Sequence, residues 1–254
     1  EKTIGNVKYT FDDRGVAQDS WVHNSDKGTW KYYGDEEEPK LHTGWFEAVP
    51  SKELNSDDHE NGTTHWYYAN SKGEITIPTA DGEVGVVKTI DGKSYLFNSD
   101  GEMVTGLRIL TYDGSKITNI SSEVDTADTV KNMNSDTMKL VYFESNGAAK
   151  TGTTTITLDG TSYTFSFKSN GSPRGVGETG ISDGYIYQNG LRLTADEDTK
   201  YGVVTYKNES YVVNEKGSIQ KNKKNLKDAD ETYYCTNAKG ILLHSSTEKC
   251  TTKH

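Results

Sequence analysis

Short stretches in which aromatic or β-branched residues alternate with polar ones recur along most of the chain, and each runs into a polar turn that ends in Gly. Alternation predicts a strand with one buried face, and the Gly predicts a turn whose positive φ other residues resist. The clearest copies are KYTFDDRG (8–15), WYYANSKG (66–73), SYLFNSDG (94–101), LVYFESNG (140–147), TFSFKSNG (164–171), SYVVNEKG (210–217) and YYCTNAKG (233–240), with a shorter relative, YIYQNG, ending at Gly190. We therefore expect each copy to be a strand, a turn and a return strand that leads into the next unit.

The repeat continues at irregular but short steps, because most closing glycines from Gly73 onward follow one another at intervals of 19 to 28 residues. A single two-stranded hairpin is marginally stable in water, so successive hairpins must stack to bury their aromatic faces. The sequence therefore predicts an all-β protein, an elongated solenoid of stacked β-hairpins. Two long polar interruptions, at 47–63 and 108–139, break the period, and we expect loops or extra strands there.

Alignment of the copies on their closing Gly separates two faces, because side chains alternate along a strand. Positions six and four before the Gly are apolar in nearly every copy, so we assign this face to the stacking core. Positions seven and five vary, and we expect that face to be open to a ligand. Only WYYANSKG is aromatic at both, with Trp66 and Tyr68, although Trp30 and Tyr32 alternate in the same way in TWKYYG.

The four tryptophans, at 21, 30, 45 and 66, all lie in the first part of the chain. The N-terminal part therefore looks specialised for binding. We divide the chain into residues 1–107, with Trp-containing repeats, and residues 108–254, with degenerate repeats and the two cysteines.

A GW pair followed by a WYY hairpin and a polar turn ending in Gly resembles the cell-wall-binding repeat family. Its members include the choline-binding modules of Gram-positive surface proteins, the glucan-binding repeats of glucansucrases and the receptor-binding repeats of clostridial toxins. The resemblance implies a solenoid of hairpins whose ligand sites lie between consecutive repeats and are lined by aromatic residues of the GW and WYY strands. On the matching positions, one set is Trp45 of TGWF with Trp66 and Tyr68, and a second set is Trp21, Trp30 and Tyr32.

The later copies depart from the pattern, since they read TGL (105–107), TGT (151–153) and GVV (85–87 and 202–204) where the family has a tryptophan. A choline site needs a box of aromatic rings around a quaternary ammonium, and most repeats here lack the residues for it. One or two aromatic rings are enough to stack on a sugar while polar neighbours bind its hydroxyl groups. We therefore favour a glycan over choline.

Composition and charge narrow the possible partners and the compartment. A net charge of -10 argues against binding to nucleic acid or an anionic membrane, and no stretch approaches the length of a membrane span. The chain begins at Glu1 within what looks like a repeat, so we expect a piece of a longer protein, secreted or held at a bacterial cell surface. Cys235 and Cys250 could be free thiols or a disulfide. The disulfide is favoured, fits export and would add about 3 kcal/mol of stability.

The sequence carries no motif of a catalytic, metal or cofactor site. None of the six histidines has a paired metal spacing, and we interpret His65, beside Trp66, as an exposed strand residue that could also hydrogen-bond a ligand. We interpret the acidic run at 35–38 as a solvated loop, and the Asp and Asn residues of the repeats as turn formers. A glycosidase needs two carboxylates on a rigid cleft, which hairpin repeats do not offer, so we expect no enzyme activity.

The main hypothesis is a non-catalytic module that binds a polysaccharide or a cell-wall glycan. A second hypothesis is an adhesin that contacts a host receptor through the insertions at 47–63 and 108–139. A choline-binding anchor to teichoic acid and a purely structural spacer complete the alternatives. The identity of the sugar and the oligomeric state stay open.

Overall fold

The structure is a computed structural model that describes residues 2–5, 7–170 and 174–251; the predicted closing glycine Gly171 and His254 lie outside them. Strands make up 45% of the chain and helices 5%, which confirms the all-β prediction. The chain forms two compact units, residues 1–123 with 142–149, and residues 124–141 with 150–254.

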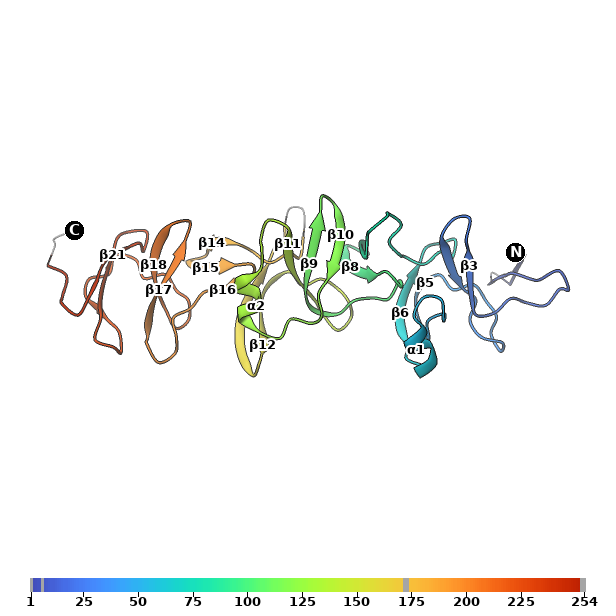
Figure 1. The fold of residues 1–254 in the computed structure, drawn as a ribbon, viewed down its shortest axis with the longest axis horizontal. Coiled ribbons are helices and arrows are strands. Elements are labelled where there is room, and N and C mark those ends of the chain that lie inside the picture. Colours follow the sequence, from blue (N-terminus) through green and yellow to red (C-terminus); the bar gives the residue numbers. More distant parts are fainter. Residues whose placement is uncertain (1, 6, 171–173, 252–254) are drawn as a thin grey trace. The chain divides into compact units, whose positions relative to one another are not determined.

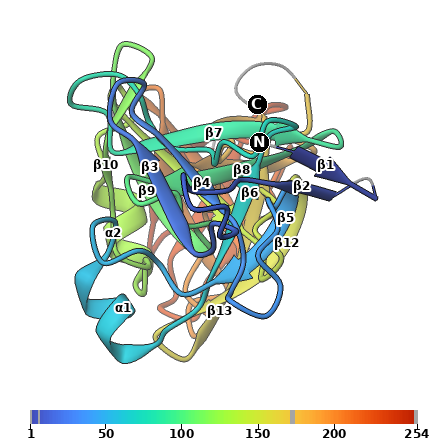
Figure 2. The ribbon, with the colours of Figure 1, turned by 90° about the vertical axis from the view of Figure 1, so that its right-hand side faces the viewer.

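The first unit is built from antiparallel hairpins (Figure 1; Figure 2 shows the β1–β2 pair). The pairs β1–β2, β3–β4 and β5–β6 form two-stranded sheets, and β7, β8, β9 and β10 belong to a five-stranded sheet in the order β11-β9-β10-β7-β8. The elements are β1 (Lys2–Ile4), β2 (Val7–Tyr9), β3 (Trp21–Asn24), β4 (Thr29–Tyr32), β5 (Gly44–Ala48), α1 (Ser56–Asn61), β6 (His65–Ala69), β7 (Gly85–Ile90), β8 (Lys93–Asn98), β9 (Gly106–Asp113) and β10 (Lys116–Ile120).

The second unit has a five-stranded sheet in the order β12-β13-β16-β15-β14, the pair β17–β18, and the three strands β19-β20-β21. Its elements are α2 (Ala127–Asn132), β12 (Gly152–Leu158), β13 (Thr161–Phe167), β14 (Gly180–Ser182), β15 (Tyr185–Gln188), β16 (Leu191–Arg192), β17 (Tyr201–Tyr206), β18 (Glu209–Asn214), β19 (Leu226–Lys227), β20 (Tyr233–Thr236) and β21 (Leu242–Ser246). β11 (Met138–Phe143) contributes residues to both units.

The predicted repeat is present in the structure, since each of the eight copies contains a strand: β2, β6, β8, β11, β13, β15, β18 and β20. The described closing glycines all have a positive φ, for example 78° at Gly73 and 80° at Gly217. The residue three before the Gly fixes the turn. The side-chain oxygen of Asn70 accepts hydrogen bonds from the amides of Lys72 and Glu74, and Asn98, Asn214 and Asn237 make the same pair of bonds.

The residue two positions after a closing Gly joins one hairpin to the next. The amide of Met103 donates to the carbonyl of Trp66 at 2.9 Å, and that of Ile219 donates to Gly184 at 2.9 Å. The same side chains cover the following closing glycine, because a Cβ at Gly147 would collide with Met103 and one at Gly240 with Ile219. Gly147 and Gly240 are therefore needed both for their backbone conformation and for the close approach of the neighbouring side chain.

The predicted core face is buried, with Tyr67, Phe97 and Val213 at 0% exposure. The predicted open face is wrong in several copies, because Leu96 and Val212 are also at 0% and Leu140 is at 1%. The chain that follows each turn continues along the strand, as when the amide of Val104 donates to the carbonyl of Leu96. The aliphatic side chains of Leu96, Val212 and Leu140 are buried, so the hairpins of these copies bury apolar residues on both faces.

The two insertions were expected to form loops or extra strands, and β10 is such a strand. They also contain the short helices α1 and α2, which we did not expect. Asn55 caps α1 by accepting from the amide of Asp58, and Gly62 ends it in the left-handed conformation. Thr126 caps α2 in the same way, and Ala127 and Val130 bury its inner face. Six residues are too few to show a helical period in the sequence, so only these caps could have indicated the helices.

Candidate functional site

The β5–β6 hairpin presents one apolar face to the core and one aromatic face outward. Trp45 lies directly across from Tyr68, and Glu47 lies across from Trp66. The intervening residues Phe46 and Tyr67 point to the opposite face and are buried.

Three aromatic rings gather around Trp45, and we name Trp45, Tyr68, Tyr95 and Phe97 the Trp45 cluster. The ring centroid of Trp45 is 5.1 Å from that of Tyr68, 4.8 Å from Tyr95 and 5.8 Å from Phe97. Trp45, Tyr68 and Tyr95 are half-buried, while Phe97 is fully buried below them. Because Tyr95 and Phe97 come from β8, two consecutive hairpins build this cluster.

Polar and charged groups border the Trp45 cluster. The ammonium of Lys88, on β7, lies 5.8 Å from the ring centroid of Tyr68. On the same face, Trp66 is 45% exposed and the carboxylate of Glu47 accepts a hydrogen bond from the hydroxyl of Thr64 at 2.6 Å. Aromatic planes beside a hydrogen-bond donor and an acceptor can stack on a sugar ring and bind its hydroxyl groups.

The second predicted set, Trp21, Trp30 and Tyr32, lies in a hydrophobic core. Trp30 is 7% exposed and stacks on His23 with centroids 4.3 Å apart. Trp21 and Tyr32 pack against the buried residues Phe46 and Tyr67. Trp30 is thus buried, whereas Trp21 and Tyr32 are partly buried against the β5–β6 hairpin. That these three residues bind a ligand stays a prediction.

The electrostatics of this core support its structural role. The indole nitrogen of Trp21 donates to the carbonyl of Val49 at 2.8 Å, so its polar atom is satisfied within the protein. Burial, and then the charge of Asp35, raise the pKa of Tyr32, and burial lowers the pKa of the neighbouring His42. Both groups are therefore neutral at neutral pH, as expected in an apolar environment.

Sequence reasoning missed two features. Tyr95 was assigned to the stacking core because it occupies the same place before its Gly as Tyr67, yet its ring lies against Trp45. In the second unit, the guanidinium carbon of Arg192 lies 3.8 Å from the ring centroid of Tyr185 and 5.6 Å from that of Tyr187. The cross-strand register that places Arg192 opposite Tyr187 could not be read from the repeat alone.

His65 is half-buried rather than exposed, and it faces two carboxylates. Its Nε2 atom lies 2.9 Å from Asp58 Oδ2 and 3.6 Å from Glu102 Oε1. Among the described residues, this cluster is a set of side chains with the composition and spacing of a metal site.

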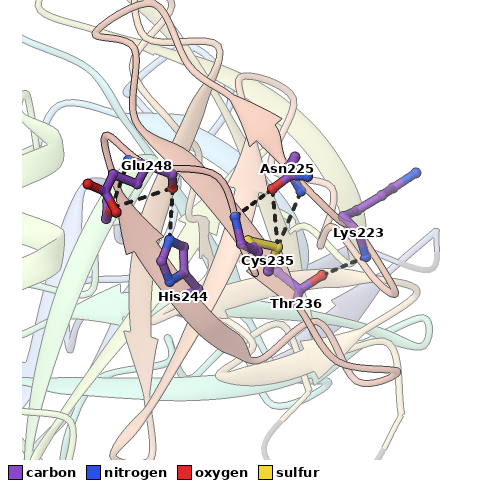
Figure 3. The surroundings of a disulfide bond; sticks show 8 residues. Lys223, Asn225, Cys235, Thr236, His244 and Glu248 are labelled. Atoms are coloured by element: carbon purple, nitrogen blue, oxygen red, sulfur yellow. Dashed lines mark hydrogen bonds between the residues drawn. A yellow bond between two sulfur atoms is a disulfide. The ribbon is translucent and has the colours of Figure 1, made fainter. Parts of the chain in front are cut away.

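Cys235 and Cys250 are joined as a disulfide, with Cα atoms 6.5 Å apart. Around it, Asn225 accepts a hydrogen bond from the amide of Cys250, and the hydroxyl of Thr236 accepts one from the amide of Lys223 (Figure 3). The bond closes a loop of 15 residues, which corresponds to about 3 kcal/mol of stabilisation.

No protein-family model and no curated protein matches the sequence. Among solved structures, CbpF in complex with ipratropium matches 93% of this chain with a TM-score of 0.53 and 20% identity, and this chain spans 62% of that one. Choline binding protein F from Streptococcus pneumoniae, in a second crystal form, matches 96% of this chain and 98% of its own at 19% identity, with a TM-score of 0.31. The phage Cp-1 endolysin complexed with choline matches 80% of this chain and 37% of its own at 14% identity, with a TM-score of 0.31.

Within the described residues, every helix is too short and too polar to cross a membrane.

At 20% identity the match to CbpF shows the fold. The chain thus shares the fold of a choline-binding repeat protein, which confirms the resemblance that its GW and WYY motifs indicated.

Proposed function

We propose that this protein is a non-catalytic module that binds a cell-wall or extracellular polysaccharide through the Trp45 cluster and Trp66. The observation that carries the proposal is the aromatic face of the β5–β6 hairpin, where Trp45, Tyr68 and the exposed Trp66 lie beside Tyr95 of the next hairpin. The fold shared with CbpF supports it.

The repeat geometry supports a solenoid as the scaffold of this function. The amides of Ile75, Met103, Ala149 and Ile219 each donate to a carbonyl of a preceding hairpin. A ladder of this kind lets each hairpin template the next, as in other repeat proteins. We infer that further hairpins in a longer parent chain would extend the same stack.

The charge beside the aromatic rings favours a glycan over choline. The ammonium of Lys88 already lies over the ring of Tyr68, so a quaternary ammonium would meet a like charge there. For a sugar, the same ammonium is a hydrogen-bond donor, and Glu47 is an acceptor on the same face. Sugar hydroxyl groups match this pair of groups.

A location outside the cytoplasm, by secretion or at a bacterial cell surface, is consistent with the disulfide between Cys235 and Cys250. Structural disulfides persist in oxidising compartments. A polysaccharide ligand would be encountered in the same place.

Retention on insoluble polysaccharides tests the proposal. We expect the protein to be retained on purified cell wall or on an α-glucan, and Trp45→Ala to weaken retention at least tenfold because its ring contacts three others. Trp66→Ala should weaken it as well. Leu243→Ala is the matched control, since Leu243 is exposed to 44%, close to the 45% of Trp66, and lies in the second unit.

Far-ultraviolet circular dichroism of each variant separates loss of binding from loss of fold. Equal retention of the parent and of both tryptophan variants would overturn the proposed site. Elution by free choline, with no effect of competing oligosaccharide, would replace the glycan by choline as the ligand.

A further inference from the structure

Three side chains from different parts of the first unit meet at the start of β6. Asp58 belongs to α1, His65 begins β6, and Glu102 follows the turn after β8. Their potential ligand atoms all lie within 4.8 Å of one another. The insertion at 47–63, which carries no recognisable motif, thus brings a carboxylate to a histidine of the repeat.

Two asparagine side chains hold these carboxylates in place. The amide nitrogen of Asn55 donates to Asp58 at 2.8 Å and to Glu102 at 3.0 Å. Asn98 donates to the other oxygen of Glu102 at 2.9 Å, and its own carbonyl oxygen accepts from the amide of Glu102. Glu102, at 7% exposure, is oriented from both sides.

Negative charge exceeds positive charge in this partly buried cluster. The ion pairs that the structure gives for Asp58 and Glu102 both involve His65. The carboxylate of Asp100 is a third acidic group near Glu102. Three carboxylates therefore face one imidazole, and neutral amides do not cancel their charge. A divalent cation would.

The hydroxyl of Tyr67 provides a second, independent observation. Tyr67 lies two residues after His65, on the same face of β6, and its side chain is fully buried. Its oxygen has no hydrogen-bond partner within the described part of the chain. The acidic groups near this hydroxyl are Glu102, Asp100 and Asp58. Water bound to a metal ion there would give this hydroxyl its missing partner.

We propose that Asp58, His65 and Glu102 bind a zinc ion, with water completing the coordination. Zinc accepts imidazole nitrogen and carboxylate oxygen together, whereas calcium and magnesium prefer oxygen alone. Two atoms bound to one zinc at about 2.0–2.2 Å in tetrahedral geometry lie roughly 3.4 Å apart. The 3.6 Å between His65 Nε2 and Glu102 Oε1 is close to that spacing, the 2.9 Å between His65 Nε2 and Asp58 Oδ2 is shorter, and all three atoms lie within 4.8 Å of one another.

An entry path is present. His65, Asn98 and Glu102 line a cavity of about 560 Å³ together with Arg108 and the chain around Thr118. Because His65 and Tyr67 point away from the face that carries Trp66 and Tyr68, zinc binding is independent of the proposed glycan site.

Calorimetric titration of zinc into tag-free, EDTA-treated protein at pH 7.5 tests the proposal. We expect one equivalent to bind, and cobalt(II) to give the visible absorption of a site with nitrogen and oxygen ligands. His65→Gln and Asp58→Asn should each weaken binding at least tenfold. His23→Gln is the matched control, because His23 pairs with an exposed carboxylate, that of Glu53, at 3.8 Å.

Thermal unfolding supplies a second readout. Zinc should raise the unfolding temperature of the parent and of His23→Gln but not of His65→Gln. Absence of uptake by the parent, or equal uptake by His65→Gln, would overturn the proposal and leave the three residues as an ion-pair network. Trp45→Ala should bind zinc as the parent does, so failure of the glycan site and failure of the zinc site are distinguishable.

Discussion

The Trp45 cluster of the first unit and the tyrosine pair Tyr185–Tyr187 of the second are both aromatic faces of the hairpin repeat, but they differ in how a cation contacts them. The ammonium of Lys88 lies 5.8 Å from the ring centroid of Tyr68 in the Trp45 cluster. Arg192, in contrast, lies 3.8 Å from Tyr185 and donates to the hydroxyl of Tyr187 at 3.0 Å. The second unit thus places its cation over both rings of the pair, whereas the first unit places its cation over one ring of the Trp45 cluster.

Lys88 and Arg192 are both half-buried, and the rings that they contact explain why their contributions should differ, since Tyr68 is only half-buried. Tyr187 is 4% exposed, and the Nε atom of Arg192 is buried with no hydrogen-bond partner among the described residues. A cation–π contact in such a desolvated place contributes about 2 kcal/mol, against about 0.5–1 kcal/mol at an exposed one. Repeats without a tryptophan can therefore use tyrosines for stability.

The largest expected effect is on the stability of the second unit. Arg192→Met should lower the free energy of unfolding by about 2 kcal/mol, because it removes the guanidinium but keeps an unbranched side chain against Gly217. Lys88→Met should lower it by less than about 1 kcal/mol. Urea denaturation measures both, and Arg14→Met, at a side chain 81% exposed, is the control. Equal losses for Arg192 and Lys88 would remove the distinction between the two faces.

A smaller effect on stability is expected when a cation added to the solution takes the place of the Arg192 guanidinium. Arg192→Ala should leave a gap beside Tyr185 and Tyr187 that a tetramethylammonium ion can enter, since quaternary ammonium ions bind to aromatic faces. We expect this ion to stabilise the variant by about 1 kcal/mol in thermal melts, relative to the same concentration of sodium chloride, and to leave the parent unchanged. The same stabilisation of the parent would show that Arg192 does not occupy such a site.

The strands and turns could be predicted because their signals are local. The alternation before each Gly, the Asn three residues earlier and the Gly itself lie within one copy, so the strands β6, β8 and β18 follow from eight residues each. The same locality placed Trp66 and Tyr68 on one face, where cross-strand pairing sets Trp45 beside them.

The remaining features depend on contacts between copies. Trp30 and Tyr32 alternate just as Trp66 and Tyr68 do, but Phe46 of the next hairpin packs on Tyr32 and Trp30 is buried. Tyr95 joins Trp45 only through the packing of β8 against β5, and Asp58 reaches His65 through a six-residue helix. Packing between neighbouring hairpins, rather than the sequence pattern within one hairpin, decides which aromatic rings are available to a ligand.

The role of Lys88 can be tested by its effect on ligand choice. Lys88→Met should increase the affinity for choline about two- to fivefold, because the like charge over Tyr68 is gone. It should not increase retention on polysaccharide, because a sugar loses a hydrogen-bond donor. Equilibrium dialysis with choline and retention assays on the same preparation measure the two effects. An increase in both would contradict the assignment of Lys88 as a group that selects against cations.

The smallest effect is expected at Tyr95, and it tests whether the ring alone completes the Trp45 cluster. Tyr95→Phe keeps the ring that lies 4.8 Å from Trp45, so retention on polysaccharide should stay within about twofold of the parent. Tyr95→Leu removes the aromatic contact, which contributes about 0.5–1.5 kcal/mol, and should weaken retention more. A large loss with phenylalanine would mean that the hydroxyl binds the ligand, and Tyr95 would then be a polar contact like the one that Tyr187 makes with Arg192. In that case a tyrosine hydroxyl would make a polar contact in both units. The hydroxyl of Tyr187 binds a group of the protein, whereas that of Tyr95 would bind a group of the ligand.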